Sequence, residues 1–385
     1  MKISAPRIFD DGKSVVVSAD FICGQDRDTL WFKLATEYRE YVETERSDAF
    51  LVGLLFYAMI RGEDIEIEST ISEKLYYNLS NYLIPALTLA NPKLLPIKVF
   101  PAKLATESVN IGKSVGTGFS GGIDSFCTIY EHYANSRCPQ GYRLTHLTFF
   151  NTGSHGDLGG DEARVLFNKR FNILKEFPKE IGLNFIFVDS NISEVLQMNF
   201  ASTHTMRNMA PVLLLQKLFR VYYYSSGYRM DDFRIIGAAS DTSSYDILNT
   251  AMLSTESVNL YSSGTQYTRV EKTALISKYE PTWRYLNVCA SDDHNCSSCF
   301  KCMRTLFTLE LVGNIQNYSQ VFDLSKYSQQ RKRYIAEILY NKKKYIYRDI
   351  FDKMIKRGFS VPFRSRLIFA CLFVLRFFRK IIRST

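Results

Sequence analysis

The most constraining feature of this sequence is a tight corner between an apolar run and a helix-forming segment. Residues 115–119 read as a short strand, residues 120–125 read Ser-Gly-Gly-Ile-Asp-Ser, and the residues after them favour a helix. A strand that turns directly into a helix points several backbone N–H groups and the positive end of the helix dipole at one spot. Adjacent glycines permit a positive φ and let an anion approach the backbone without a Cβ in the way. The corner therefore predicts a phosphate-binding loop.

Short apolar runs alternate with helix-forming stretches from about residue 111 onward. This alternation is typical of βαβ units, and it predicts an α/β fold with a mostly parallel, Rossmann-like sheet and helices on both faces. The expected strands are residues 115–119, 144–150, 185–188 and 233–237. Ligands of such sheets bind beyond the carboxyl ends of the strands. The residues that we expect at those ends are Ser120, Asn151, Asp189 and Ala238.

The segments on either side of this central part differ from it in character. The N-terminal segment contains a weakly alternating strand at 14–20, an apolar stretch typical of a buried helix at 48–59 and an alternating strand at 64–68. The C-terminal segment is helical and basic. We therefore expect three parts, which are an α+β unit of residues 1–108, a ligand-binding domain of residues 109–312 and a basic helical region of residues 313–385.

Positive charge is concentrated in the C-terminal tail. The chain has a net charge of +9, yet residues 326–385 alone hold 17 Lys or Arg against three acids. The apolar run at 367–375 is too short to cross a hydrocarbon core of about 30 Å as a helix. We expect the tail to dock on the protein body, with an anionic membrane surface or a nucleic acid as alternative partners. The unit of residues 1–108 is the candidate surface for a protein partner.

The expected location is the cytoplasm, because no apolar leader follows Met1. A peripheral position at the inner face of the membrane is the alternative that the basic tail leaves open. Thiols stay reduced in the cytoplasm. The eight cysteines are therefore expected to be metal ligands or small buried residues rather than disulfides.

Four cysteines fall close together in the pattern C-x6-C-x2-C-x2-C. Thiolates at this spacing suit one tetrahedral zinc ion, and an iron–sulfur cluster is the alternative. His294 lies inside the loop and is an alternative ligand. We expect the zinc to pin the loop rather than to take part in chemistry. The predicted ligands are Cys289, Cys296, Cys299 and Cys302.

The corner at residues 120–125 resembles the SGGxDS signature of the N-type PP-loop ATP pyrophosphatases. The resemblance implies an adenine-nucleotide α-hydrolase-like fold and cleavage of ATP between its α and β phosphates. It also implies that a substrate oxygen attacks the α-phosphate and that a nitrogen or sulfur nucleophile then displaces the adenylate. Because a four-cysteine site follows the loop, the chain looks most like the 7-cyano-7-deazaguanine synthase branch, whose members carry zinc after the ATP domain.

Two further stretches are similar to that branch, and one of them departs from it. Arg207-Asn208 is similar to an Arg-Asn pair that the branch places at the head of a helix. Residues 237–246 are similar to its strand-end motif Gly-x-x-x-x-Asp-x-Ser-Gly-Tyr-Pro-Asp-Cys-Arg. Here the first Asp comes one residue sooner, Ser244 replaces the second Gly, and Pro, Cys and Arg are missing. The resemblance covers roughly residues 111–310, and it supports the ATP chemistry better than the 7-deazaguanine substrate.

The loop residues are the expected ATP site. Serine hydroxyls donate to phosphate oxygens, and the Asp124 carboxylate suits Mg²⁺, which prefers a carboxylate, waters and phosphates. The expected catalytic residues are Asp124, Ser125 and Arg207, with Arg207 as the cation for the α-phosphate or the departing pyrophosphate. Arg269 is a further phosphate candidate, with a solvated helix face as the alternative for it and for Lys272. The expected ATP-binding residues are Ser120, Gly121, Gly122, Asp124, Ser125, Asn151 and Lys272.

The substrate candidates come from the motif stretches and from the loop after the second strand. His155 is a candidate for substrate contact or proton transfer, although a lone loop histidine usually does neither. Aspartates in a Ser/Thr-rich loop are also common turn formers. The candidates are His155, Asn208, Asp241, Tyr245 and Asp246.

The expected function is an ATP-dependent ligase that forms C–N bonds, with ATP, Mg²⁺ and Zn²⁺ as cofactors. It would adenylate a carboxylate or amide-like oxygen and then add ammonia from solution or a partner, since nothing in the chain resembles a glutaminase domain. Sulfur transfer is an alternative, but it needs a reactive thiol, and Cys127 is expected to be buried on the helix after the loop. The other alternative is an ATP-binding scaffold of a multi-gene system, such as phage defence or surface-glycan synthesis.

Overall fold

The protein divides into two compact units by its contacts. A computed structural model describes residues 1–289 and 293–382, with side chains up to residue 372. The first unit comprises Met1–Ser120 and Thr128–Gln266, and the second comprises Gly121–Cys127 and Tyr267–Thr385. These units follow different boundaries from the ranges 1–108, 109–312 and 313–385, which stay sequence-based predictions.

The first unit is built on one large sheet. Eleven strands of the described residues join it, in the order β11-β10-β7-β8-β9-β4-β3-β1-β5-β6, with β2 paired to β3. The half from β11 to β9 is parallel throughout, and β4 then joins β9 in the antiparallel sense. The parallel half comprises β7 (Ser114–Gly118), β8 (His146–Asn151), β9 (Asn184–Ser190), β10 (Phe219–Ser225) and β11 (Asn259–Ser263). The architecture is thus α/β and consistent with a Rossmann-like fold.

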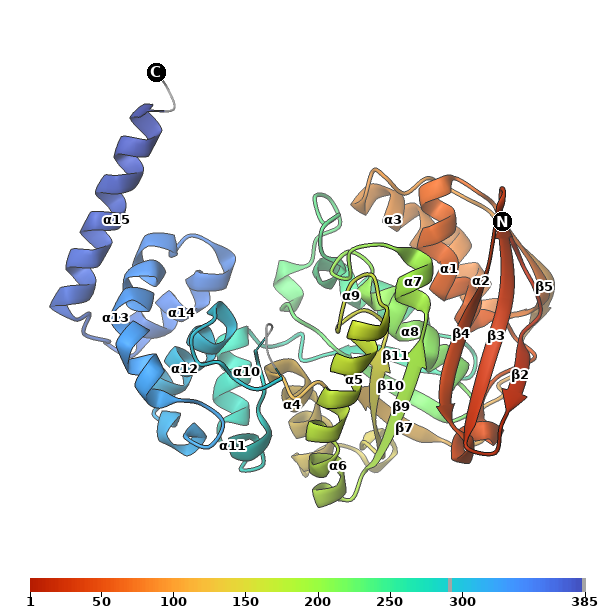
Figure 1. Cartoon of the computed structure of the whole chain (residues 1–385), viewed down its shortest axis with the longest axis horizontal. Helices are drawn as coiled ribbons and strands as arrows, with labels where there is room; N and C mark the ends of the chain where they lie inside the picture. Colours follow the sequence, from red (N-terminus) through yellow and green to blue (C-terminus); the bar gives the residue numbers. More distant parts are fainter. Residues whose placement is uncertain (290–292, 383–385) are drawn as a thin grey trace. The chain divides into compact units, whose positions relative to one another are not determined.

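The N-terminal strands extend the same sheet. In Figure 1 the long strands β3 and β4 lie side by side with β2, all in red. Their pairing with β9 means that residues 1–108 and the parallel half share one sheet. The bounds are β1 (Lys2–Ile3), β2 (Arg7–Asp10), β3 (Ser14–Cys23), β4 (Asp26–Ala35), β5 (Ile65–Ser72) and β6 (Val99–Ala105). The strands expected at 14–20 and 64–68 are confirmed.

Helices cover both faces of the parallel half. Side chains on β9 alternate between the two faces, as a strand requires. Phe185 and Phe187 stack with aromatic residues of α5 (Asp161–Leu174), whereas Ile186 and Val188 join a core that includes α1 (Asp48–Arg61) and α8 (His204–Leu214). The expectation of helices on both faces is confirmed here. The buried helix expected at 48–59 is confirmed as α1, which is followed by Gly62 with a left-handed φ of 67°.

One expected strand is wrong. Residues 233–237 form turns rather than a strand, so Ala238 does not follow a strand end. The run is short, and two of its large apolar residues, Phe233 and Ile236, are exposed, which a central strand of the sheet would not allow. The strand beside β7 is instead β10, with the sequence Phe-Arg-Val-Tyr-Tyr-Tyr-Ser. Its aromatic and β-branched residues favour a strand, and they are largely buried.

The described residues of the second unit form helices and connecting loops, without a strand. Helix α12 packs against α10, α13 and α14, and α15 packs against α13. The side chains from residue 373 onward and the whole of residues 383–385, which complete the basic tail, lie outside the described part. No helix among the described residues is long and apolar enough to cross a membrane. The helices are α10 (Arg269–Ile276), α11 (Thr282–Tyr285), α12 (Phe300–Val312), α13 (Leu324–Asn341), α14 (Tyr345–Lys356) and α15 (Phe363–Ile382).

Candidate functional site

The glycine corner, which is the stretch of residues 120–125, has the local structure that its sequence predicts. Strand β7 ends at Gly118 and α4 (Ile123–Ile129) begins five residues later. Gly121 adopts a φ of 74°, which favours glycine over any residue with a Cβ. The Gly122 carbonyl accepts the Phe126 N–H at 3.0 Å and the Ser125 hydroxyl at 3.0 Å, which closes the first helical turn. The N–H groups that open this helix thus follow directly after the two glycines.

Asp124 lies in that first turn and is held by two cations of α10. Arg269 Nη1 is 2.7 Å from Oδ2, and Lys272 Nζ is 3.2 Å from Oδ1. A capping box between Thr268 and Glu271 fixes the start of α10 and with it both cations. Burial alone would raise the pKa of Asp124, but Arg269 and Lys272 outweigh it, so the pKa lies below its usual range. The carboxylate is therefore ionised at neutral pH.

Two more cations approach this carboxylate from α12. Burial and the neighbouring Arg269 lower the pKa of Arg304 to about 10, although Asp124 acts in the opposite direction. Burial, Arg269 and Arg304 likewise lower the pKa of Lys301. The Arg304 Nε is buried and has no hydrogen-bond partner among the described residues. Four cations thus lie within electrostatic reach of one carboxylate, a surplus of positive charge that suits a polyanion.

Sequence reasoning identified Arg269 and Lys272 but missed Lys301 and Arg304. Both follow the last two cysteines so closely that they read as part of the metal-binding stretch. Their spacing of three residues on a helix is the signal that was available, because it places them on one face.

A second polar cluster lies in the first unit and includes three of the predicted substrate residues. His204, at the start of α8, is hydrogen-bonded through Nδ1 to the Tyr224 hydroxyl of β10 at 2.5 Å. Its Nε2 is 3.1 Å from the Ser243 hydroxyl and 3.4 Å from Asp241 Oδ1. Asn208 donates to the His204 carbonyl at 2.8 Å and accepts from the Thr152 hydroxyl at 2.9 Å. The network thus connects α8 with the ends of two strands and with the Ser/Thr-rich loop.

The two aspartates of this cluster have opposite electrostatic environments. Burial opposes ionisation of Asp241, but hydrogen bonds from His204 and Ser243 outweigh it and lower its pKa. Burial raises the pKa of Asp246 to about 6. Asp246 accepts from the Thr205 hydroxyl at 2.5 Å through Oδ1, while its Oδ2 has no partner among the described residues. Paired groups with divergent pKa values are able to act as proton acceptor and proton donor.

Sequence reasoning missed His204 and Tyr224 in this cluster. His204 precedes the Arg-Asn pair by one helical turn, and a polar residue one turn away on the same face was the available signal. Tyr224 was missed because its strand was not predicted. The remaining substrate candidate of the loop, Tyr245, is buried with 2% of its surface exposed.

Three predicted site residues make contacts of a structural kind. Arg207 is fully buried and donates to the carbonyls of Asp157 and Met198 at 3.0 and 2.6 Å. Asn151 donates to the Asp189 carboxylate at 2.7 Å. His155 is buried against Phe149 and Phe167, and burial lowers its pKa to about 3, so its ring is neutral at physiological pH. In this conformation Arg207 has no exposed surface with which to contact a phosphate.

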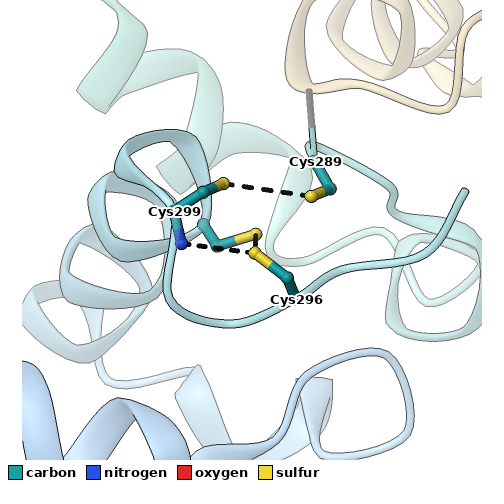
Figure 2. Close-up of side chains that lie close together, drawn as sticks. Cys289, Cys296 and Cys299 are labelled. Carbon is teal, nitrogen blue, oxygen red and sulfur yellow. Dashed lines mark hydrogen bonds between the residues drawn. The ribbon is translucent and has the colours of Figure 1, made fainter. Parts of the chain in front are cut away.

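The four cysteines form a group that fits one metal ion. Their sulfur atoms all lie within 4.8 Å of one another, and none is in a disulfide. Figure 2 shows the Cys289 and Cys299 sulfurs facing each other. These two sulfurs are 3.9 Å apart, and those of Cys296 and Cys302 are 4.0 Å apart. Tetrahedral zinc with Zn–S bonds of about 2.3 Å requires sulfur separations of about 3.8 Å. The thiols are therefore placed as a metal site needs.

The environment of the thiols also favours metal binding. The Cys299 N–H donates to the Cys296 sulfur at 3.3 Å (Figure 2). Burial opposes ionisation of Cys296, but hydrogen bonds from Ser298 and Cys299 outweigh it and lower its pKa to about 6. Burial raises the pKa of Cys302, which a divalent cation would reverse. His294 is exposed and paired with Asp293, and it is not one of the four grouped ligands.

Comparison with protein-family models, with curated proteins and with solved structures gave no match to this chain.

Proposed function

We propose that this protein is an ATP pyrophosphatase of the PP-loop type, with an adenine-nucleotide α-hydrolase-like fold. The observation that carries the proposal is the glycine corner, where the helix of Asp124 begins beside the cations Arg269 and Lys272. Backbone N–H groups, a helix N-terminus and a surplus of cations suit the phosphates of a nucleotide. The site lacks the Gly-x-x-x-x-Gly-Lys-Ser/Thr pattern of the common nucleotide hydrolases, which favours a different phosphate chemistry.

The proposed reaction has two steps. A carboxylate or amide-like oxygen of the substrate attacks the α-phosphorus of ATP, and the α–β bond breaks to release pyrophosphate. Ammonia then attacks the carbon that bears the adenylated oxygen, the bond between that carbon and the oxygen breaks to release AMP, and one proton is lost to a base. The cations of α10 and α12 would stabilise the charge that builds on the departing pyrophosphate.

Magnesium would be held by Asp124 together with phosphate oxygens. Both oxygens of this carboxylate contact cations, so the metal fits only once phosphates compete for Arg269 and Lys272. When bound, Mg²⁺ supplies charge neutralisation on the phosphates.

The polar cluster of the first unit is the proposed substrate-binding element. Asp241 orients the ring of His204 through its contact with Nε2. The raised pKa of Asp246 keeps a second carboxyl available to hold a proton near pH 6. These groups suit binding and proton transfer at a substrate with N–H and O–H groups.

Zinc is the metal that we propose for the four cysteines, because a closed set of four thiolates suits it. The sulfur-transfer alternative is weaker, since Cys127 is fully buried and the grouped cysteines are placed for metal binding. A cytoplasmic location, a role of residues 1–108 toward a protein partner, and lipid or nucleic-acid binding by residues 326–385 remain predictions. An ATP-binding scaffold without turnover is the second candidate, because the motif at residues 237–246 departs from the synthase pattern.

Exchange of labelled pyrophosphate into ATP tests the adenylation step. The protein would be incubated with ATP, Mg²⁺, labelled pyrophosphate and a small-molecule cell extract. We expect label in ATP that depends on the extract, because reversal of the first step requires the substrate adenylate. A Lys272→Met variant should lose the exchange, whereas Lys326→Ala, at an exposed pair on α13, should keep it. Absence of exchange together with intact ATP binding would favour the scaffold.

A further inference from the structure

A chain of hydrogen bonds connects the cysteine cluster with the glycine corner inside the second unit. The backbone N–H of Asn287 donates to the Gly121 carbonyl at 2.8 Å. The Asn287 side chain accepts from the Cys289 N–H at 3.2 Å and donates to the Asp293 carbonyl. The residue that holds Gly121 is therefore fixed by the backbone of the first cysteine ligand and of Asp293.

A second asparagine strengthens this connection. The Asn295 side chain accepts from the Val288 N–H at 2.8 Å and donates to the Leu286 carbonyl at 2.8 Å. Asn295, which directly precedes Cys296, is thereby hydrogen-bonded to the residues on both sides of Asn287. Residues 286–288, which contact the glycine corner through Asn287, are therefore hydrogen-bonded to Cys289 and to the residue before Cys296, both of which belong to the metal-binding stretch.

The cations of α12 depend on the same cysteines. Cys299 is the residue before α12, and Cys302 lies in its first turn. Lys301 and Arg304 are carried on the same two turns, and α12 packs against α10, which carries Arg269 and Lys272. A metal that binds Cys299 and Cys302 therefore fixes the direction in which both α12 cations leave the helix.

We propose that the four-cysteine metal site positions the phosphate site, and that Lys301 and Arg304 bind the pyrophosphate moiety of the nucleotide together with Arg269 and Lys272. The inference rests on the proposed function. Four neighbouring cations repel one another, so their approach needs a constraint in the absence of a polyanion. Metal coordination supplies that constraint, because one bound ion holds the four cysteine sulfurs together and its binding free energy offsets the repulsion. The orphaned Nε of Arg304 then has a phosphate oxygen as its partner.

The test is calorimetric titration of inorganic pyrophosphate into the full chain with and without one equivalent of zinc. We expect the zinc-loaded protein to bind pyrophosphate at least tenfold more tightly than the metal-free protein. Lys301→Ala and Arg304→Ala should each weaken binding about tenfold in the presence of zinc, as expected for loss of a charged hydrogen bond. Lys326→Ala and Arg333→Ala are matched controls at exposed positions of α13 and should bind as the unaltered protein does.

A second variant keeps the test decisive if the metal-free protein unfolds. Asn287→Ala removes the side-chain bridge but no metal ligand, so zinc content should stay at one ion per chain. We expect this variant to bind pyrophosphate several-fold more weakly with zinc in place. Unchanged affinity in Asn287→Ala, Lys301→Ala and Arg304→Ala would overturn the inference while leaving the proposed function intact. If the zinc-loaded protein binds neither pyrophosphate nor ATP, the proposed function itself fails.

Discussion

Replacing Asp124 with asparagine isolates the electrostatic role of the carboxylate at the centre of the phosphate site. The substitution keeps the size of the side chain and removes the charge that Arg269 and Lys272 both contact. The Lys272 side chain is 1% exposed, so water cannot solvate its ammonium group well once the ion pair with Asp124 is lost. We expect the variant to be less stable than the unaltered protein without ligand.

The expected loss of stability in Asp124→Asn follows from how deeply the three charged side chains are buried. Removing one partner of a fully buried ion pair costs about 3–5 kcal/mol, and exposed pairs contribute about 0–1 kcal/mol. The Asp124 and Arg269 side chains are 22% and 26% exposed, whereas Lys272 is almost completely covered. The site lies between the two limits, and we expect the free energy of unfolding at pH 7 to fall by about 2 kcal/mol.

The pH dependence gives this prediction a second signature. Because the pKa of Asp124 is depressed in the folded protein, its stabilising effect is present above the unfolded pKa of about 3.9 and is lost as the pH falls through the folded value. The stability difference between Asp124→Asn and the unaltered protein should therefore be constant above about pH 5 and shrink below about pH 4.

Urea unfolding between pH 3.5 and 8 measures both quantities, with Asp352→Asn on the exposed face of α14 as the control. The same substitution removes a negative charge next to the proposed phosphate position, where even in water two charges about 4 Å apart interact by about 1 kcal/mol. Pyrophosphate without Mg²⁺ should therefore bind the variant several-fold more tightly. Equal stability at pH 7, or weaker binding of metal-free pyrophosphate, would refute this account of the site.

Three further predictions concern the other clusters. Asp246→Asn should raise the free energy of unfolding at pH 7 by up to about 2 kcal/mol, because burial disfavours the ionised form of this carboxyl and raises its pKa to about 6. The gain in stability should vanish below about pH 4, and urea unfolding that shows the same gain at every pH would contradict the prediction. His204→Gln should lower turnover at least tenfold with unchanged ATP affinity by calorimetry, and equal turnover would remove His204 from the proposed substrate site. Elemental analysis should find one zinc per chain, and Cys299→Ser should lower the zinc content and the Tm; full zinc retention in that variant would argue against the site.

Local sequence signals predicted the features that depend on neighbouring residues. The corner after β7 was predictable because two glycines between an apolar run and a helix former allow few other structures. Helix α1 was predictable from its continuous apolar length. The cysteine cluster was predictable because all four ligands lie close together in the sequence, between residues 289 and 302.

Features that depend on distant residues were not predictable in the same way. The pairing of β4 with β9 joins residues more than 150 positions apart, and nothing in either strand specifies the partner. Strand β10 contains three consecutive tyrosines, which obscure the period of two, and its sequence therefore gives no clear strand signal. The grouping of Lys301 and Arg304 with Asp124 depends on the packing of α12 against α10, which the sequence does not reveal.

The nucleotide product of the reaction tests the central claim most directly. The protein would be incubated with Mg²⁺, ATP labelled at the α-phosphate and a small-molecule cell extract, in parallel with Asp124→Asn. We predict labelled AMP and an equal amount of pyrophosphate with the unaltered protein, and neither with the variant. Formation of ADP in place of AMP would contradict the proposed cleavage between the α and β phosphates.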